Sequence, residues 1–314
     1  MTTRMDQQPS SDLELVGLLA AMKASDTVEL KMTVANDEHQ ATVGSLPIDP
    51  VEAQPRQVFF FDTPDLRLNQ AGVVVRARRI QGGRGDTVIK LRPVVPETLP
   101  EELRKSPAFN VEVDVLPGNN GICSASLKGR VTGAEIRDAV HGDFPLRKLF
   151  TKDQRAFFKD HAPADLELDA LCILGPTFVM KSVFTPDELG RRVVAELWLY
   201  PDGTRILELS TKCLPNEAFQ VAVEARAYLA SRQITVEIGA QQTKTKTALE
   251  FFSAHLLASG KTDLVADALG GLGSGEVSHG GSPDDDDDDD DDASRVPNAF
   301  VELDDEDDAV AAGN

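Results

Sequence analysis

The strongest constraint on the fold is a two-faced strand pattern that recurs along the chain. In the segment 27–34 (TVELKMTV), Glu29 and Lys31 alternate with apolar residues, and the segment 109–115 (FNVEVDV) alternates in the same way. Successive side chains of a β-strand point to opposite faces, so each segment has one charged and one apolar face. A solvated outer face explains one such strand. Several in succession favour a barrel with a charged lumen and an apolar outside under helices.

Other segments predict the remaining elements. Further strands are expected at 56–63, 72–80, 86–93, 149–158, 164–173, 191–200 and 204–210. Turns are expected at QGGRGD (81–86) and PDG (201–203). Helices are expected at 11–24 with Ser11 as N-cap, at 133–141, at 216–231 with Asn216 as cap, and from about residue 243. We therefore predict an α+β fold: a closed antiparallel β-barrel of eight to nine strands with helices packed outside.

Charge is unevenly distributed along the chain. The formal net charge is −20, yet residues 261–314 contain 18 acidic and 2 basic residues, and nine consecutive aspartates occupy 284–292. The remainder is nearly balanced, so an anionic substrate is not excluded. We predict an N-terminal extension with a short helix at 1–24, the barrel domain at 25–258, and a disordered acidic tail at 259–314.

Several classes of protein are excluded by missing features. The three cysteines form no CxxC, which disfavours a disulfide framework or a thiolate zinc site. Residues 1–10 have no apolar signal core, and no stretch approaches 18 apolar residues. There is no P-loop or Rossmann fingerprint. We therefore expect a cytoplasmic protein without a membrane partner, one that does not use a helix-based phosphate cradle.

The charged faces indicate the chemistry of the lumen. Residues that share a face two positions apart are Arg76 and Arg78, Lys90 and Arg92, Glu112 and Asp114, Glu167 and Asp169, and Glu208 and Ser210. Buried charges need partners, water or ligand. Clustered Lys and Arg bind phosphate oxygens, and carboxylates without His or Cys favour hard cations such as Mg²⁺ or Mn²⁺. Such a lumen suits a metal complex of a polyanion.

A family resemblance rests on the segment FFDTPDLRLNQAGVVVRARR (60–79), followed by TVIK (87–90). The order Asp62-Thr63-Pro64, Leu66, Leu68, Gly72, Arg76-x-Arg78, Thr87 and Lys90 resembles the signature of CYTH domains, the triphosphate tunnel metalloenzymes. VELK (28–31), LELD (166–169), LELS (207–210) and KTKTAL (244–249) resemble further motifs of the family, so that the resemblance spans about 25–255.

The resemblance implies Mg²⁺ or Mn²⁺ as cofactor and a small triphosphate or polyphosphate as ligand. The implied catalytic residues are Glu29, Lys31 and Glu208. The implied phosphate-binding residues are Lys31, Arg76, Arg78, Lys90, Arg155 and Lys244. The implied metal ligands are Glu29, Glu112, Asp169, Glu196 and Glu208. Nucleic acid is not expected as a partner, and a partner for the acidic tail stays open.

Two departures from the family pattern bear on the activity. Thr27 replaces the first glutamate of the family's ExExK motif, and Ser210 replaces the second glutamate of its late ExE motif. Each replacement removes a carboxylate that could bind a metal, so we expect one bound metal ion rather than two. Three functions stay open: hydrolysis of tripolyphosphate or of a nucleoside or thiamine triphosphate, formation of cyclic AMP as in class IV adenylyl cyclases, or binding without efficient turnover. The Asp62-Thr63-Pro64 run itself predicts a structural turn.

Overall fold

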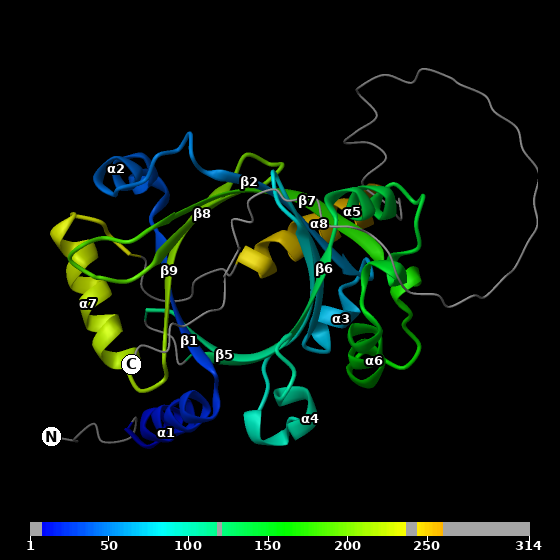
Figure 1. Cartoon of the computed structure of the whole chain (residues 1–314), viewed down its shortest axis with the longest axis horizontal. Helices are drawn as coiled ribbons and strands as arrows, with labels where there is room; N and C mark the ends of the chain where they lie inside the picture. The colour runs from blue at the N-terminus through cyan, green and yellow to red at the C-terminus, as the bar shows by residue number, and fades with distance from the viewer. Residues whose placement is uncertain (1–7, 118–120, 237–243, 260–314) are drawn as a thin grey trace, which may run out of the picture.

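A closed β-barrel forms the body of the computed structural model, which describes residues 8–117, 121–236 and 244–259. Within these residues nine strands close into a ring (Figure 1). In ring order they are β1 (Thr27–Val34), β5 (Phe109–Val115), β6 (Ile122–Val131), β4 (Gly85–Leu91), β3 (Val73–Ile80), β2 (Gln54–Asp62), β7 (Cys172–Phe184), β8 (Val193–Leu199) and β9 (Arg205–Cys213). The predicted closed barrel is confirmed.

One pairing differs from the antiparallel arrangement that we predicted. β1 pairs with β5 in parallel, with Glu29 opposite Asp114, and pairs with β9 in the antiparallel sense. Strand directions can alternate all the way around a ring only when the number of strands is even. A ring of the nine described strands must therefore contain at least one parallel contact, and β1 against β5 is that contact.

The outer face of the barrel is apolar and covered by helices, as predicted. On β3, Val73, Val75 and Ala77 are buried in the outer core together with Ile136 and Phe157. The described helices are α1 (Gln8–Ala24), α2 (His39–Ser45), α3 (Arg67–Gln70), α4 (Glu101–Arg104), α5 (Gly133–Val140), α6 (Lys152–His161), α7 (Ala218–Ser231) and α8 (Lys244–Ser259). Short 3-10 turns lie at Asn36–Glu38, Pro96–Thr98, Leu146–Leu149 and Leu168–Ala170. Figure 1 shows α1, α5, α6 and α7 outside the ring.

Helix α8 packs differently from the other helices. Its residues Ala248, Leu249 and Phe252 form one apolar cluster with Phe60 and Trp198, and the last two side chains also line the lumen. α8 contacts β7, and one of its ends projects over the opening of the ring in Figure 1. Its first residue, Lys244, is thereby brought to the lumen.

Two predicted strands between β6 and β7 are wrong. Most of the segment 149–158 belongs to α6, which begins after a capping box in which Thr151 and Gln154 satisfy each other's backbone N–H groups. The segment 164–173 contains the 3-10 turn Leu168–Ala170 and only the start of β7. Gln154 secures α6 against the barrel, since its side-chain amide donates to the carbonyl oxygens of Thr87 at 3.1 Å and Leu127 at 3.0 Å.

The Asp62-Thr63-Pro64 segment is a structural turn, as predicted. The carboxylate of Asp62 is buried and accepts hydrogen bonds from the backbone N–H groups of Thr63, Leu68 and Asn69 at 2.7, 2.8 and 3.0 Å. It therefore fixes the chain between β2 and α3 rather than facing the lumen. The predicted disordered tail lies, from residue 260 on, outside the described residues. No helix of the described segments is long and apolar enough to span a bilayer.

Candidate functional site

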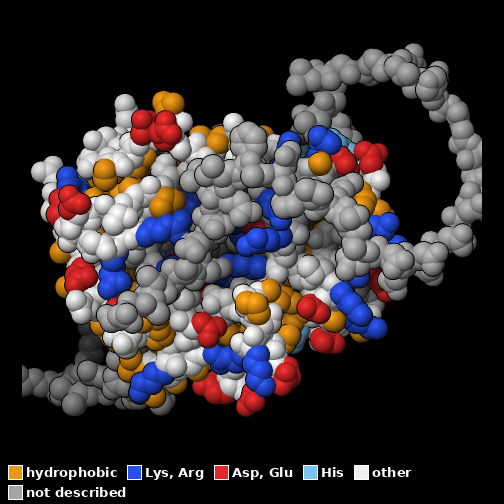
Figure 2. Space-filling model, in the orientation of Figure 1, with side chains coloured by type: hydrophobic (Ala, Val, Ile, Leu, Met, Phe, Trp, Pro, Cys, Tyr) orange, Lys and Arg blue, Asp and Glu red, His pale blue; other side chains and the backbone are white. Residues whose placement is uncertain are grey.

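The lumen of the barrel is a cavity of about 1200 Å³ lined by charged side chains from every wall. Figure 2 shows Lys and Arg side chains gathered in the hollow at the centre of the ring. The basic residues lining the cavity include Lys31, Arg56, Arg76, Arg78, Lys90, Arg92, Lys128, Lys181, Arg192, Lys212 and Lys244. A cavity with so many cations attracts polyanions.

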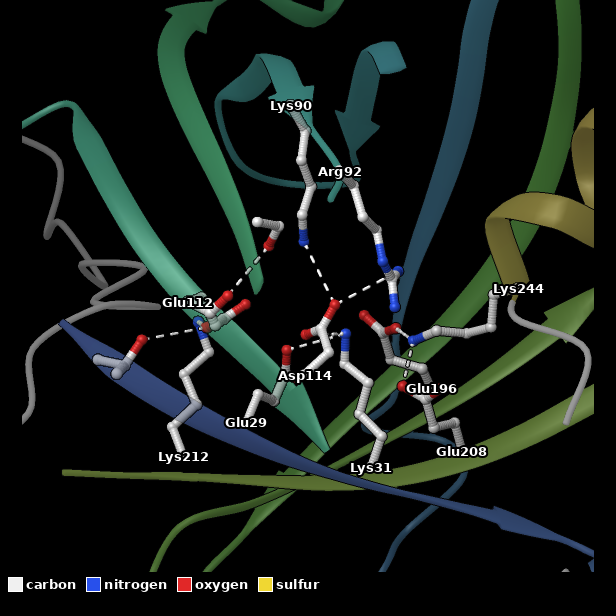
Figure 3. A network of polar contacts seen from close by, with 12 residues as sticks. Glu29, Lys31, Lys90, Arg92, Glu112, Asp114, Glu196, Glu208, Lys212 and Lys244 are labelled. Carbon is white, nitrogen blue, oxygen red and sulfur yellow. Dashed lines mark hydrogen bonds and ion pairs between the residues drawn. The ribbon is translucent and has the colours of Figure 1, made fainter. Parts of the chain in front are cut away.

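Three carboxylates meet on the β1–β5 wall of the lumen. Glu29 lies opposite Asp114 in the parallel pairing, and Glu112 lies opposite Thr27. Ligand oxygens of Glu29, Glu112 and Asp114 lie within 4.8 Å of one another. We call these three residues the carboxylate cluster; it is drawn in Figure 3. This register brings them together, because side chains two residues apart on a strand, and those directly opposite on its neighbour, share one face of the sheet.

Asp114 is the most heavily paired member of the cluster. Its side chain is fully buried and contacts Lys31 at 2.7 Å, Arg92 at 3.3 Å and Lys90 at 3.6 Å. Burial raises the pKa of Asp114, but these three cations oppose it and hold the pKa well below its usual range. Three cations around one carboxylate leave positive charge available to a further anion. Burial also lowers the pKa of Lys90, with Asp114 acting in the other direction.

Glu29 and Glu112 are each held by a lysine. Lys31 Nζ lies 3.1 Å from Glu29, and Lys212 Nζ lies 2.8 Å from Glu112. Burial raises the pKa of Glu29, but Lys31 and Lys212 outweigh it and lower the pKa from 4.5 to about 2. The Thr27 hydroxyl donates to Glu112 at 3.3 Å. Both carboxylates therefore have a lysine partner in the lumen.

A second acidic group lies on the β8–β9 wall. Glu196 and Glu208 are directly opposite each other on these strands, and the Lys244 ammonium contacts both, Glu208 at 2.7 Å. Burial raises the pKa of Glu208 despite this contact. For Glu196, burial is outweighed by Lys244 and by the Trp198 indole, so its pKa lies well below the usual range. Burial lowers the pKa of Lys244, but the two glutamates outweigh it and raise that pKa.

The carboxylate cluster fits a hard divalent cation. Its donors are all carboxylate oxygens, the ligands that Mg²⁺ and Mn²⁺ prefer. Asp114 Oδ2 is buried and makes no hydrogen bond to any described residue, although it faces Lys90 and Arg92. An oxygen in that position can accept a metal ion in addition to its ion pairs. Glu29, Glu112 and Asp114 are therefore the residues that could hold the metal.

Most residues predicted for the site lie at the lumen. The structure brings together Glu29, Lys31, Arg76, Arg78, Lys90, Glu112, Glu196, Glu208 and Lys244. Two do not join them. Arg155 lies exposed on α6, outside the barrel, and donates to the carbonyl oxygen of Phe150 at 3.0 Å. Asp169 lies in a 3-10 turn before β7 and accepts from the backbone N–H of Arg147 at 2.7 Å. Neither position reaches the lumen, because the strands predicted to carry these residues are not formed.

Several lumen residues were absent from the predicted site. They are Arg56, Arg92, Asp114, Lys128, Lys181 and Lys212. A signal existed for Asp114 and Arg92, since each alternates with a residue that was predicted, Glu112 and Lys90 respectively. Lys212 follows Ser210 on the same face of β9. Lys128 and Lys181 lie on β6 and β7, which the sequence pattern did not predict as strands.

Comparisons with known proteins support the fold. No protein-family model and no curated protein sequence matches the chain. Among solved structures, HpAC1 from Hippeastrum, a candidate adenylyl cyclase with a dominant triphosphatase activity, is 14% identical, with a TM-score of 0.51 over 74% of this chain and 95% of that chain. A candidate adenylate cyclase from Bacillus halodurans is also 14% identical, with a TM-score of 0.48 over 71% of this chain and 98% of that chain. The chain therefore shares the closed-barrel fold of HpAC1, in agreement with the fold that its sequence resemblance implied.

Proposed function

We propose that this chain is a metal-dependent phosphohydrolase that binds a small triphosphate in the barrel lumen. The substrate would be inorganic tripolyphosphate or a nucleoside or thiamine triphosphate. The observation that carries the proposal is the carboxylate cluster, which lies beside Lys31, Lys90 and Arg92 in the barrel lumen. Hard-cation ligands and phosphate-binding cations in contact are what a metal–triphosphate complex requires.

The basic residues would bind and orient the phosphates. Lys31 on β1, Lys90 on β4 and Arg92 just after β4 converge on Asp114, so their positions are set before any ligand arrives. Arg76 and Arg78 extend the basic lining along β3. Cations fixed in advance stabilise the charge that develops on phosphoryl oxygens without reorganising during the reaction.

The carboxylates would have two roles. Glu29, Glu112 and Asp114 would hold Mg²⁺ or Mn²⁺, which, when bound, neutralises negative charge on the phosphate oxygens. In Glu208, burial outweighs the neighbouring lysines and leaves the pKa raised; this carboxylate would orient the attacking water and accept its proton. Attack on the terminal phosphorus breaks the bond to the bridging oxygen and releases orthophosphate from the shortened chain.

The test is a substrate screen with purified full-length protein. Tripolyphosphate, ATP, GTP and thiamine triphosphate are incubated with Mg²⁺ or Mn²⁺, and both orthophosphate and cyclic nucleotide are measured. We expect metal-dependent phosphate release that Asp114→Asn abolishes, and weaker triphosphate binding in folded Arg76→Ala, Arg78→Ala and Lys90→Ala variants. Full binding by all three folded alanine variants would refute the assignment of the ligand to the lumen.

Cyclase chemistry is the second candidate, because the fold is shared with HpAC1, which is described both as a candidate adenylyl cyclase and as a triphosphatase. In that reaction the ribose 3′-oxygen replaces water as nucleophile. Cyclic AMP as the main product from ATP would select it. Triphosphate binding with neither product would instead indicate a binding protein, as the carboxylates missing at Thr27 and Ser210 allow.

A further inference from the structure

Glu208, which is buried, and Glu196, which is partly buried, face each other on the β8–β9 wall and require a counter-ion. Glu196 and Glu208 are cross-strand neighbours, with side chains 17% and 6% exposed. Like charges directly opposite each other on adjacent strands destabilise a sheet, and a buried carboxylate needs a cation or hydrogen bonds. Either a divalent ion or a cationic side chain could meet this requirement.

The chain supplies a cationic side chain of its own. The Lys244 ammonium lies 2.5 Å from a Glu196 oxygen and 2.7 Å from a Glu208 oxygen. It also lies 5.2 Å from the centre of the Trp198 ring, within range of a cation–π contact. The Trp198 indole donates to Glu196 at 3.1 Å. Figure 3 shows Lys244 entering from α8 and pointing between the two glutamates.

Packing of α8 fixes the position of this ammonium. Lys244 is the first residue of α8, and its carbonyl oxygen accepts a hydrogen bond from the Tyr200 hydroxyl at 3.0 Å. One turn later, Ala248 and Leu249 are buried against Trp198. The lysine therefore does not swing freely from a loop, because both its backbone and the helix that follows are anchored to the barrel.

The two acidic groups of the lumen thus differ in kind. Among the described residues, Glu29, Glu112 and Asp114 form a group of three carboxylates close enough to share a metal, and Glu196 and Glu208 are not part of that group. We propose that Lys244 occupies the cation position between Glu196 and Glu208, so that the lumen binds a single divalent ion, at the carboxylate cluster, and uses an ammonium in place of a second one. The identity of that single ion rests on the function proposed above.

The proposal is tested by counting bound Mn²⁺. Full-length wild type, Lys244→Met, Lys246→Met and the double variant Lys244→Met/Glu208→Gln are titrated with Mn²⁺, and free Mn²⁺ is measured by electron paramagnetic resonance. Lys246 is the matched control, because it lies two residues further along α8 with its side chain 62% exposed. The acidic tail is identical in all four proteins. Any Mn²⁺ that it binds adds equally to each count and drops out when the counts are compared.

We expect Lys244→Met to bind one more Mn²⁺ per chain than wild type. Lys246→Met should match wild type, and the double variant should lose the added ion. An equal count for Lys244→Met and wild type would overturn the proposal. If Lys244→Met is unfolded without metal, its near-UV circular dichroism spectrum is measured with and without Mn²⁺. Recovery of the native spectrum on addition of Mn²⁺ supports the proposal. Failure to recover that spectrum refutes it.

Failure of the proposed function has a different signature. A protein that releases no phosphate from any triphosphate would refute the hydrolase assignment, yet the difference in Mn²⁺ count between Lys244→Met and wild type would be unaffected. The count therefore tests the role of Lys244 independently of turnover.

Discussion

Replacing Glu29 by glutamine should cost the protein stability in a manner that depends on pH. Lys31 and Lys212 outweigh burial and lower the pKa of Glu29 from 4.5 to about 2. One pKa unit corresponds to about 1.4 kcal/mol, so the charged form of Glu29 contributes about 3 kcal/mol of folding free energy at neutral pH. Because the pKa is lower in the folded state, this contribution is complete above about pH 4.5 and is lost as the pH falls through about 2.

The measurement is urea unfolding of wild type and Glu29→Gln at several pH values without metal. Glutamine resembles the protonated carboxyl, so we expect wild type to be more stable by about 3 kcal/mol near pH 6 and by only about 1 kcal/mol at pH 3. Glu101→Gln, at an exposed position on α4, is the control and should differ little from wild type at either pH. A stability difference between wild type and Glu29→Gln that is the same at both pH values would refute the reasoning, since the loss would then not arise from the charge.

Three further perturbations follow from the structure. Asp114→Ala leaves three lumen cations without their common carboxylate; we expect a loss of about 3–5 kcal/mol in urea unfolding, partly restored by added tripolyphosphate. Gln154→Ala leaves the buried carbonyl of Thr87 without the amide that donates to it; we expect a loss of about 2–4 kcal/mol, and a value below 1 kcal/mol would show that water replaces the amide. Gly72→Ala places a Cβ 2.9 Å from the Arg92 carbonyl oxygen at a φ of +75°; we expect a lower melting temperature and a loss above about 1 kcal/mol.

The strands that the sequence predicted best are those with complete alternation. Thr27–Val34 and Phe109–Val115 form strands with the predicted bounds. In both, charged residues face the lumen and apolar residues face the outer core, so the period of two is visible in the sequence alone. The hairpin of β8 and β9 was marked in addition by the Pro-Asp-Gly turn.

The strands that were missed have composition or geometry that masks the pattern. β6 (ICSASLKGRV) contains serine, alanine and glycine where larger side chains usually mark a strand. β7 contains Gly175-Pro176, a pair that argues against a central strand. The β2–β7 register shifts between Val58 and Phe60, so the proline is accommodated at an irregularity in the pairing. Both segments form strands because they pair with neighbouring strands of the barrel, and a local sequence pattern does not reveal that pairing.

The wrong strand at 149–158 had a local signal against it. Phe157 and Phe158 suggested a strand, yet both are buried on one face of α6. Thr151 followed three residues later by Gln154 is the spacing of a capping box, and that motif is formed. The error at Asp169 has a different origin, because a short acidic motif carries no information about strand partners or register.

The departure from the family pattern at Thr27 takes on another meaning once the strand pairing is known. Thr27 alone indicates a lost metal ligand. In the parallel β1–β5 pairing, however, Thr27 lies opposite Glu112 and donates its hydroxyl to that carboxylate. Glu112 thereby supplies, from the neighbouring strand, a carboxylate close to Glu29 and Asp114. Thr27 therefore contacts a carboxylate of the cluster that lies 85 positions away in the chain, a contact that depends on the β1–β5 register and could not be read from the motif itself.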